Sequence, residues 1–492
     1  MNKDNLIVSK SPPLDILLID PPYMSLKGSR RGFGYNLGLT CIAAYLRKEG
    51  LTARIISGDI LYDSYIFYMH KYLKSYVQGK ISLPSYSTDK AYTYRQILED
   101  DNHIVWRKIR TIIREHYPLA VGISYLSPAE HVVKKIAKLT KSIDKGIKVI
   151  VGGHHPTHCC SEIMEDKEID FVIRGEGETP LLSLMRELKS KHPDLNTVPG
   201  ILWRRDDATV ITNPNALQIQ DLDTLPFPAR DAVIGLDYKK FPFHRLSTTR
   251  GCLYQCNFCA DKALWHGKIR QRSVENVIEE MLMLKKSCPK IKNLFFNDGT
   301  FTFNRPFVIK LCKKMIEDHI GLVWGCSARY DNIDLELLSV MKKAGCTLLY
   351  LGVESGSEGI LNAMRKNIRV SAIIQKTDQI RRSGITTVVS VLFGIPGETR
   401  DDMEKTLSLM KKLKVDYFDV NSYVPLPGTI LYDKVIGEQK KKVDWLKTSF
   451  SSGTCFNDAV SPQILRDTLL KAYAIGRKRR IRSMLRLVFK PA

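Results

Sequence analysis

The feature that most limits the fold of this chain is a repeated alternation of short β-prone segments with segments of helical periodicity. In the first half, apolar runs of strand length are expected at 15–20, 52–57, 120–124, 148–151 and 171–174. The first ends at a Pro-Pro turn and is followed by a glycine-rich loop at 28–34 and a helical stretch. This alternation predicts an α/β fold with a doubly wound, Rossmann-like parallel sheet, whose ligand lies beyond the carboxyl ends of the strands.

The second half of the sequence repeats the alternation with a different number of units. Six strands are expected, near 245–249, 293–297, 322–327, 347–352, 386–393 and 417–423. Each is followed by a helical segment, so they predict a partial (β/α)6 TIM barrel with its functional loops at the carboxyl ends of the strands.

These patterns predict four regions. A Rossmann-like domain is expected at 1–190, a hairpin and proline-rich linker at 191–242, the partial barrel at 243–430, and a helical extension at 431–492. The first domain contains a long tyrosine-rich insert at about 61–118, and long connections of this kind form added helices or functional walls. Both a helical packing face and a wall of a substrate pocket are compatible with its tyrosine spacing.

Composition limits the partners and the compartment. Lys and Arg outnumber Asp and Glu by 75 to 52, a net charge of +23, which attracts anionic partners such as a phosphorylated substrate or an anionic membrane, although a solvated basic surface would look the same. The chain has 11 cysteines at irregular spacing and begins with a polar segment, so we expect the reducing cytoplasm. Its apolar runs are far shorter than the roughly 20 residues of a membrane span.

Three of the cysteines form the most specific chemical signal. Cys252, Cys256 and Cys259 have the spacing C-x3-C-x2-C, and three thiolates so placed can each hold one iron of a 4Fe–4S cluster. The fourth iron would then be open to the amino and carboxylate groups of S-adenosylmethionine (SAM), whose reductive cleavage gives a 5′-deoxyadenosyl radical. The alternatives are a zinc site and buried structural cysteines, but zinc needs a fourth closing ligand, and His266 is the single nearby one.

The cysteine loop resembles the cluster-binding loop of the radical SAM superfamily. The resemblance includes Phe258, at the position where the family has an aromatic residue near the adenine of SAM. It implies further SAM contacts at the carboxyl ends of the barrel strands. Asn297 and Asp298, followed by Gly299, stand where the family has a Gly-Gly-Glu segment for the SAM amino group.

The next three strand ends supply the remaining implied SAM contacts. Ser327 and Arg329 would bind the SAM carboxylate, which a guanidinium matches with two parallel hydrogen bonds. Glu354 would accept hydrogen bonds from the ribose hydroxyls, and the backbone of 394–399 would hold the adenine. From the residues alone, Arg329 could instead pair with Asp331, and Glu354 could cap the next helix.

Loops at the carboxyl ends of the N-terminal strands carry glycines and polar residues on one edge of the predicted sheet. Glycine lets the backbone approach a large ligand closely. These residues alone indicate a cofactor-sized crevice, and a nucleotide or another small molecule would suit the same pattern. The candidate ligand-binding residues of this edge are Asp20, Pro21, Ser124, Gly152, Gly153, His154, Thr157 and Glu176.

The segments around these residues resemble the cobalamin-binding domain of class B radical SAM methylases. They are DPPY, G-L-x-x-I-A-A-Y-L-R, V-G-I-S, V-G-G-x-H-x-T and G-E-G-E. Other corrinoid enzymes bind cobalt through a D-x-H-x-x-G histidine, and the sequence lacks that motif, so the resemblance implies cobalamin with its tail base displaced. Gly152, Gly153 and Thr157 would border the tail and Ser124 would hydrogen-bond to it. His154 would have a structural role or contact the tail, with cobalt ligation by His154 or His155 as the alternative.

Together the two resemblances imply a cobalamin-dependent radical SAM enzyme, expected to methylate an unactivated carbon by way of methylcobalamin and the 5′-deoxyadenosyl radical. The alternatives are a cyclase or rearrangement enzyme without methyl transfer, and a non-catalytic corrinoid or cluster carrier. We expect an electron donor such as flavodoxin or ferredoxin, and a small-molecule substrate that is lipid or anionic. The identity of that substrate is left open.

The C-terminal extension is predicted to be a basic amphipathic helix that starts at Ser461 and Pro462, a good N-cap and first turn. Basic residues at 477–480 lie beside its apolar stripe. Peripheral contact with an anionic membrane and docking on the barrel are both compatible with this pattern. Nucleic-acid binding is not expected, because aromatic stacking residues are sparse there.

Overall fold

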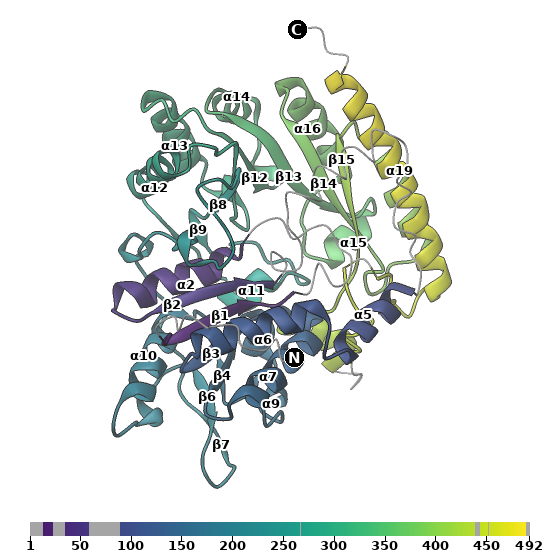
Figure 1. Cartoon of the computed structure of the whole chain (residues 1–492). Helices are drawn as coiled ribbons and strands as arrows, with labels where there is room; N and C mark the ends of the chain where they lie inside the picture. The colour runs from purple at the N-terminus through teal and green to yellow at the C-terminus, as the bar shows by residue number, and fades with distance from the viewer. Residues whose placement is uncertain are drawn as a thin grey trace, which may run out of the picture. The chain divides into compact units, whose positions relative to one another are not determined.

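The computed structural model describes residues 13–22, 35–58, 89–265, 267–437, 443–450 and 452–488. The chain forms two compact units (Figure 1). Unit 1 comprises Met1–Ile219 and Leu225–Tyr238, and unit 2 comprises Gln220–Thr224 and Lys239–Ala492. The predicted glycine-rich loop at 28–34 and the tyrosine-rich stretch up to residue 88 of the insert lie outside the described residues.

Unit 1 contains a sheet of seven strands in the order β2-β1-β3-β4-β5-β6-β7. The first five pair in parallel, and the predicted hairpin adds β6 and β7 as antiparallel strands beside β5. The strands are β1 (Ile16–Asp20), β2 (Ala53–Ser57), β3 (Ala120–Ser124), β4 (Lys148–Gly152), β5 (Phe171–Ile173), β6 (Ile201–Arg204) and β7 (Val210–Thr212). The order 2-1-3-4-5 reverses direction between β1 and β3, and ligands of such sheets bind at this switch point.

Helices pack on both faces of this sheet, as a doubly wound fold requires. Helix α2 packs against α10, and α6 packs against α7. Asn36 begins α2 because its side chain accepts a hydrogen bond from the Leu39 backbone N–H (3.1 Å). The helices are α2 (Leu37–Lys48), α5 (Asp89–Glu99), α6 (Ile104–His116), α7 (Glu130–Ile143), α8 (His154–His158), α9 (Cys160–Ile163) and α10 (Glu178–Lys189). Helices α5 and α6 form the described part of the predicted insert.

Unit 2 contains six parallel strands in sequence order, which confirms the predicted partial (β/α)6 barrel. Within the described residues, β8 and β15 form the two edges of this sheet. The strands are β8 (Phe243–Leu246), β11 (Asn293–Phe296), β12 (Val323–Ala328), β13 (Cys346–Glu354), β14 (Thr386–Phe393) and β15 (Tyr417–Ser422). A separate antiparallel ribbon joins β9 (Thr249–Arg250) to β10 (Arg270–Gln271).

Helices follow the barrel strands, as Figure 1 shows for α13, α14 and α16. Most have good caps. Thr399 and Asp402, for example, form a reciprocal capping box at the start of α17. The helices are α11 (Ala260–Trp265), α12 (Val274–Ser287), α13 (Arg305–Glu317), α14 (Leu335–Lys343), α15 (Glu358–Ala363), α16 (Val370–Ser383), α17 (Arg400–Lys412), α18 (Ile430–Tyr432) and α19 (Pro462–Val488).

The C-terminal helix α19 packs along β15 and α17 of its own unit (Figure 1). Ser461 caps it as predicted, since its hydroxyl accepts from the Ile464 backbone N–H (3.3 Å). Leu465, Leu469 and Ala472 are buried by this packing. Docking on the barrel is therefore observed for the first half of α19. In the described part of the chain, we find no helix with the length and apolarity to cross a membrane.

Candidate active site

The cysteine loop follows β9 at the carboxyl end of the first barrel strand. Its first turn requires glycine, because Gly251 has φ +101° and a Cβ there would lie 1.9 Å from the Lys268 carbonyl oxygen. Cys256 is buried, and Cys252 and Cys259 are half-buried. The loop thus presents three thiols from one tightly folded segment.

Burial controls the protonation of these thiols in the protein without metal. It raises the pKa of Cys259 to about 12 and raises the pKa of Cys252, so both carry a proton at neutral pH and iron binding would displace it. Among the described residues, no group of three or more His, Cys, Asp or Glu is arranged to hold a metal ion. In a cluster each thiolate binds a different iron, so three ligands need not converge on one point. His266, the predicted zinc alternative, lies outside the described residues.

Asp298 ties the end of β11 to the segment that leads into the cysteine loop. Its Oδ1 accepts hydrogen bonds from the Thr248 N–H (2.8 Å) and from the Thr249 N–H (2.6 Å) and hydroxyl (2.7 Å). Ser247 Oγ donates to the same oxygen, and Thr248 Oγ1 donates to Oδ2 (3.2 Å). Burial raises the pKa of Asp298, and these hydrogen bonds oppose the rise. The carboxylate thus orients the loop, and it has little accepting capacity left for a SAM amino group.

The residues beside Asp298 approach the cysteine loop closely. A Cβ on Gly299 would lie 2.7 Å from Asp261 Oδ2 and 3.5 Å from Cys252 Cβ. Thr300 Oγ1 lies 3.9 Å from Cys252 Sγ. Asn297 is exposed at this strand end, where its side chain is available to a ligand. The structure therefore places the Asn297–Gly299 segment against the cluster loop, as the sequence predicts.

Arg329 lies at the end of β12 with its guanidinium buried against the cysteine loop. It makes a two-pronged pair with Asp331, Nε to Oδ1 at 3.0 Å and Nη2 to Oδ2 at 2.9 Å. Nη1 donates to Cys256 Sγ (3.7 Å) and Nη2 to the Lys366 carbonyl (2.7 Å). Asp331 thus occupies the guanidinium edge that would bind a SAM carboxylate. Ser327 is half-buried two residues earlier.

Glu354 ends β13 in a strained conformation. Its φ of +68° is unusual for a residue with a side chain, and such strain concentrates at functional sites. Glu354 Oε1 accepts from Lys366 Nζ (2.9 Å) in a buried ion pair, so Glu354 does not cap the next helix. Gly352 lies directly beneath this pair, and a Cβ there would lie 2.1 Å from Glu354 Oε1, so a larger residue would displace the carboxylate. The second carboxylate oxygen has no hydrogen bond of its own in the described structure that would compete with a ribose hydroxyl.

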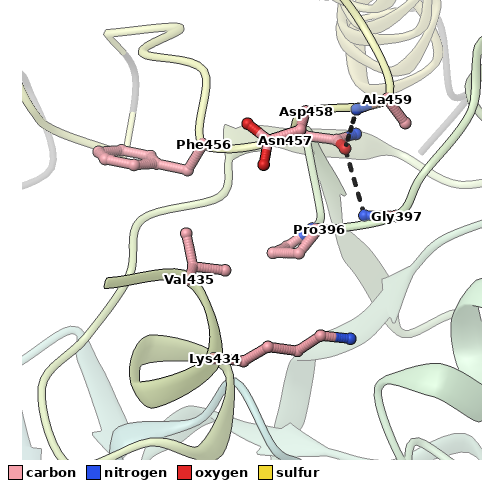
Figure 2. Close-up of a pocket in the computed structure, with 8 residues that line it drawn as sticks. All are labelled: Pro396, Gly397, Lys434, Val435, Phe456, Asn457, Asp458 and Ala459. Atoms are coloured by element: carbon pink, nitrogen blue, oxygen red, sulfur yellow. Dashed lines mark hydrogen bonds between the residues drawn. The ribbon is translucent and has the colours of Figure 1, made fainter. Parts of the chain in front are cut away.

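A pocket of about 230 Å³ opens beside the loop that follows β14 (Figure 2). Asn457 holds its walls together, because its Oδ1 accepts from the Gly397 N–H (3.2 Å) and the Ala459 N–H (3.0 Å). The lining residues are Pro396, Gly397, Lys434, Val435, Phe456, Asn457, Asp458 and Ala459. Apolar walls with nearby backbone amides suit a flat heterocycle, and this loop is where the resemblance implies adenine.

The pocket and the cysteine loop share one apolar cluster. Phe456, which lines the pocket, and Phe258, which lies between two cysteines, both pack against buried residues that include Ile395. The implied adenine contact of Phe258 is therefore compatible with this pocket. The remaining members of the cluster are Ile360, Met364, Leu392, Tyr423 and Leu431.

Unit 1 brings the predicted cobalamin residues of β3 and β4 together at the carboxyl edge of its sheet. Gly153 has φ +99°, and a Cβ there would lie 2.9 Å from Ser124 Oγ and 3.0 Å from the Tyr125 nitrogen. Thr157 Oγ1 donates to the Gly153 carbonyl (2.7 Å) and accepts from the Gly175 N–H (3.0 Å). These contacts link the loops after β3, β4 and β5 into one surface.

His154 provides the clearest indication of a ligand at this edge. The residue is 6% exposed, and both of its ring nitrogens are buried without a hydrogen-bond partner. Burial, together with the neighbouring His158 and His155, lowers its pKa to about 3, so the imidazole is neutral with a free lone pair. His155, in contrast, pairs through Nδ1 with Ser127 Oγ (2.8 Å). An orphaned imidazole beside Gly153 fits a corrinoid that supplies its missing partner.

The other predicted residues of this edge have partners within unit 1. Asp20 ends β1 and accepts a hydrogen bond from Asn36 Nδ2 (3.1 Å), and Pro21 is buried beside it. Glu176 Oε2 accepts from the Ile219 backbone N–H (2.8 Å). Asp20 and Ser124 thus mark the switch point between β1 and β3, whereas Glu176 fastens the start of the linker.

Sequence reasoning missed several residues of the site. Asp261 lies two residues after the last cysteine, and Tyr254, whose ring contacts the Arg329 guanidinium, lies between the first two, so proximity to the motif was the available signal. Lys366, the ion-pair partner of Glu354, and Asn457, which organises the pocket, lie in segments without any motif. Only the folded structure brings them to the site.

Comparison with known proteins agrees with this geometry. Residues 246–410 match the family model of the radical SAM superfamily, and residues 91–185 match that of the B12 binding domain. An uncharacterized methyltransferase of Pyrococcus horikoshii is 32% identical over 68% of this chain and 72% of its own length. An anaerobic magnesium-protoporphyrin IX monomethyl ester cyclase of Rubrivivax gelatinosus is 25% identical over 78% of this chain and 71% of its own.

The fold has a similar counterpart among solved structures. The radical SAM methyltransferase TsrM of Kitasatospora setae, solved with cobalamin and a [4Fe-4S] cluster bound, has a TM-score of 0.61 at 14% identity, covering 86% of this chain and 78% of that one. The chain therefore belongs to the cobalamin-dependent radical SAM enzymes. Its cofactors are a 4Fe–4S cluster, SAM and cobalamin.

Proposed function

We propose that this enzyme is a methyltransferase that transfers a methyl group from SAM to an unactivated carbon of a small molecule. The observation that carries the proposal is the 32% identity to a protein named as a methyltransferase, over most of the length of that protein. The match to the B12 binding domain supports it, because cobalamin is a carrier of methyl groups.

When bound, cobalamin supplies the methyl carrier, and the cluster with SAM supplies the radical that removes hydrogen from the substrate. One SAM donates the methyl group, a second SAM is cleaved to methionine and 5′-deoxyadenosine, and two electrons from a reductant complete the balance. The residues of the chain provide binding and orientation. Cys252, Cys256 and Cys259 would hold the cluster, and Asp298 fixes the approach to their loop. His154 and Gly153 form the surface for the corrinoid.

The test uses SAM with an isotopically labelled methyl group and needs no knowledge of the substrate. The anaerobically loaded protein is reduced, and the protein-bound corrinoid is analysed by mass spectrometry for the label. A methyltransferase transfers the label to the corrinoid and forms S-adenosylhomocysteine. An unlabelled corrinoid, with 5′-deoxyadenosine still formed, would contradict the proposal.

That contrary outcome would favour the second candidate, a cyclase or rearrangement enzyme that uses cobalamin without methyl transfer. The observation in its favour is the 25% identity to a magnesium-protoporphyrin cyclase over 78% of this chain. Absence of both the label and 5′-deoxyadenosine would indicate a non-catalytic carrier instead.

We also propose a flavodoxin or ferredoxin as the electron donor, because the basic chain, with a net charge of +23, would attract an acidic protein. The same charge supports a lipid or anionic substrate. A reducing cytoplasm suits a chain whose described cysteines are all free. Peripheral membrane contact would use the outward side of α19, where Arg477 and Lys478 are exposed.

A further inference from the structure

Arg329 touches the sulfur of one cluster ligand, a contact that SAM binding does not require. Its Nη1 donates to Cys256 Sγ at 3.7 Å, and both residues are buried. The contact joins a permanent positive charge to one of the three thiols. Hydrogen bonds to the sulfurs are among the factors that set the reduction potential of an iron–sulfur cluster.

The guanidinium is fixed on every side by its own unit. Asp331 accepts hydrogen bonds from Nε and Nη2, and the Lys366 carbonyl also accepts one from Nη2. The guanidinium carbon stands 3.7 Å from the centre of the Tyr254 ring, a cation–π contact, and the Tyr254 hydroxyl donates to Asn332 Oδ1 (2.7 Å). Arg329 is therefore held with Nη1 directed at Cys256.

The immediate surroundings of Arg329 are poor in solvent. The residue is 6% exposed, and Cys256 is 8% exposed. Charges interact more strongly where water is excluded, so a cation at this position acts on the cluster with little screening. Asp331 offsets part of this charge, but its side chain is 37% exposed and contacts the opposite edge of the guanidinium.

We propose that Arg329 is a positioning residue that raises the reduction potential of the 4Fe–4S cluster through its hydrogen bond to Cys256. The electron comes from a flavodoxin-class or chemical reductant, and the oxidised cluster gains it. The added negative charge on the cluster sulfurs is stabilised by the charged N–H of Arg329. The proposal depends on the cluster assignment and is independent of whether the enzyme methylates or cyclises.

The test measures the potential itself, by a redox titration of the cluster followed by electron paramagnetic resonance, without SAM or substrate. In Arg329→Gln the charge is lost, and we expect the equilibrium constant for cluster reduction to fall at least tenfold, which is 59 mV for a one-electron couple. Arg329→Lys keeps the charge but not the planar guanidinium with its fixed N–H directions, so its potential should lie between those of Arg329→Gln and the wild type. Iron and sulfide contents are measured for each variant.

Asp331→Asn is the matched control, because it removes the partner of Arg329 but keeps the donor to Cys256. Its potential should be no more negative than that of the wild type. The affinity for SAM is measured in parallel, since Arg329 is also the predicted carboxylate contact. An unchanged potential in Arg329→Gln with weakened SAM binding would overturn the proposal in favour of that role.

Two other outcomes would also overturn it. One is an equally negative potential in Arg329→Gln and Asp331→Asn, which would indicate a general loosening of the loop. The other is loss of iron from both Arg329 variants while Asp331→Asn retains it, which would make Arg329 a structural support of the cluster. Neither outcome would affect the labelled-methyl experiment, so the two proposals fail separately.

Discussion

The backbone conformation of Gly153 shapes the carboxyl edge of the sheet in unit 1, where the predicted cobalamin residues lie. Its φ is +99°, and an added Cβ would lie 2.9 Å from Ser124 Oγ. We expect Gly153→Ala to separate the loops after β3 and β4, to destabilise the protein by about 1–3 kcal/mol, and to reduce the cobalamin retained in gel filtration. Gly175→Ala is the control, because Gly175 also has positive φ (+75°) but has open space where its Cβ would be. Equal cobalamin loss in both variants would contradict the role of the close contact.

The buried side chain of His154, whose ring nitrogens lack hydrogen-bond partners, makes the stability of the protein depend on pH. Burial lowers its pKa to about 3 from 6.5, so below pH 6.5 the unfolded chain takes up a proton that the folded chain does not. Its contribution to stability is complete above pH 6.5 and is lost as the pH falls toward 3. In urea unfolding of the cofactor-free protein, the free energy of unfolding of His154→Phe should therefore fall less on acidification below pH 6.5 than that of the wild type.

The same substitution should weaken cobalamin binding by about tenfold, because the cofactor loses a polar partner worth on the order of 1–3 kcal/mol. Binding is measured by titration of hydroxocobalamin and its visible spectrum. His154→Gln, which retains a hydrogen-bonding group, should recover part of the affinity. Wild-type affinity in His154→Phe would show that the imidazole does not contact the corrinoid.

At the scale of strands and helices, the sequence predicted those elements whose bounds depend on neighbouring residues alone. β3 and β14 span the predicted 120–124 and 386–393, because each is a β-prone run bounded by turn residues. The start of α19 at Ser461 and Pro462 was equally predictable from capping. The pairing of Arg329 with Asp331 was predicted from their proximity in the sequence, but the contact of Arg329 with Cys256 and the ion pair of Glu354 were not. Arg329 was predicted to bind SAM, and its contact with Cys256 has no sequence signal.

The loop after β14 contains a second pH-sensitive element. Glu398 Oε2 accepts from the Gly394 N–H (2.7 Å), while Oε1 is buried without a partner. Burial raises the pKa of Glu398 to about 8, against the opposing backbone hydrogen bonds and with a smaller contribution from the Asp402 charge. The folded chain thus keeps a proton that the unfolded chain releases above pH 4.5. This contribution to stability is complete below pH 4.5 and is lost as the pH rises to 8.

Glu398→Gln should remove this loss of stability with rising pH, because glutamine is neutral at every pH and its side-chain oxygen can still accept from the Gly394 N–H. At pH 8.5 the variant should be more stable than the wild type, by on the order of 1.4 kcal/mol for each unit of pKa difference. Denaturant unfolding at a series of pH values measures the difference. Parallel profiles for the two proteins would show that the carboxyl is ionised in the fold throughout.

The pocket beside this loop can be closed without disturbing the core. Ala459 lines it and is exposed, so a tryptophan there has room to occupy the cavity. If the pocket holds adenine, Ala459→Trp should raise the Kd for SAM at least tenfold, while the iron content stays at the wild-type value. Calorimetry on the cluster-loaded protein measures this, with Ala459→Ser as the control. Unchanged SAM affinity would assign the pocket to another ligand.

At the scale of the whole molecule, the net charge of +23 governs encounters with other proteins. If the electron donor is an acidic flavodoxin, association is accelerated by long-range attraction that salt screens. The bimolecular rate of cluster reduction by flavodoxin should fall about tenfold between roughly 0.05 and 0.5 M NaCl. Reduction by a photoreduced deazaflavin, a neutral small molecule, should change little. Equal salt dependence for both reductants would argue against steering.

Helix α19 has a consequence for the behaviour of the chain in solution. An open barrel leaves β15 with unpaired backbone groups, which in other proteins recruit strands from neighbouring molecules. Here the Tyr473 hydroxyl donates to the Val420 carbonyl (3.0 Å), and the Ser422 N–H donates to the Phe450 carbonyl (2.8 Å). The helix and the segment before it therefore cover the edge of β15, where a strand from another molecule would otherwise pair.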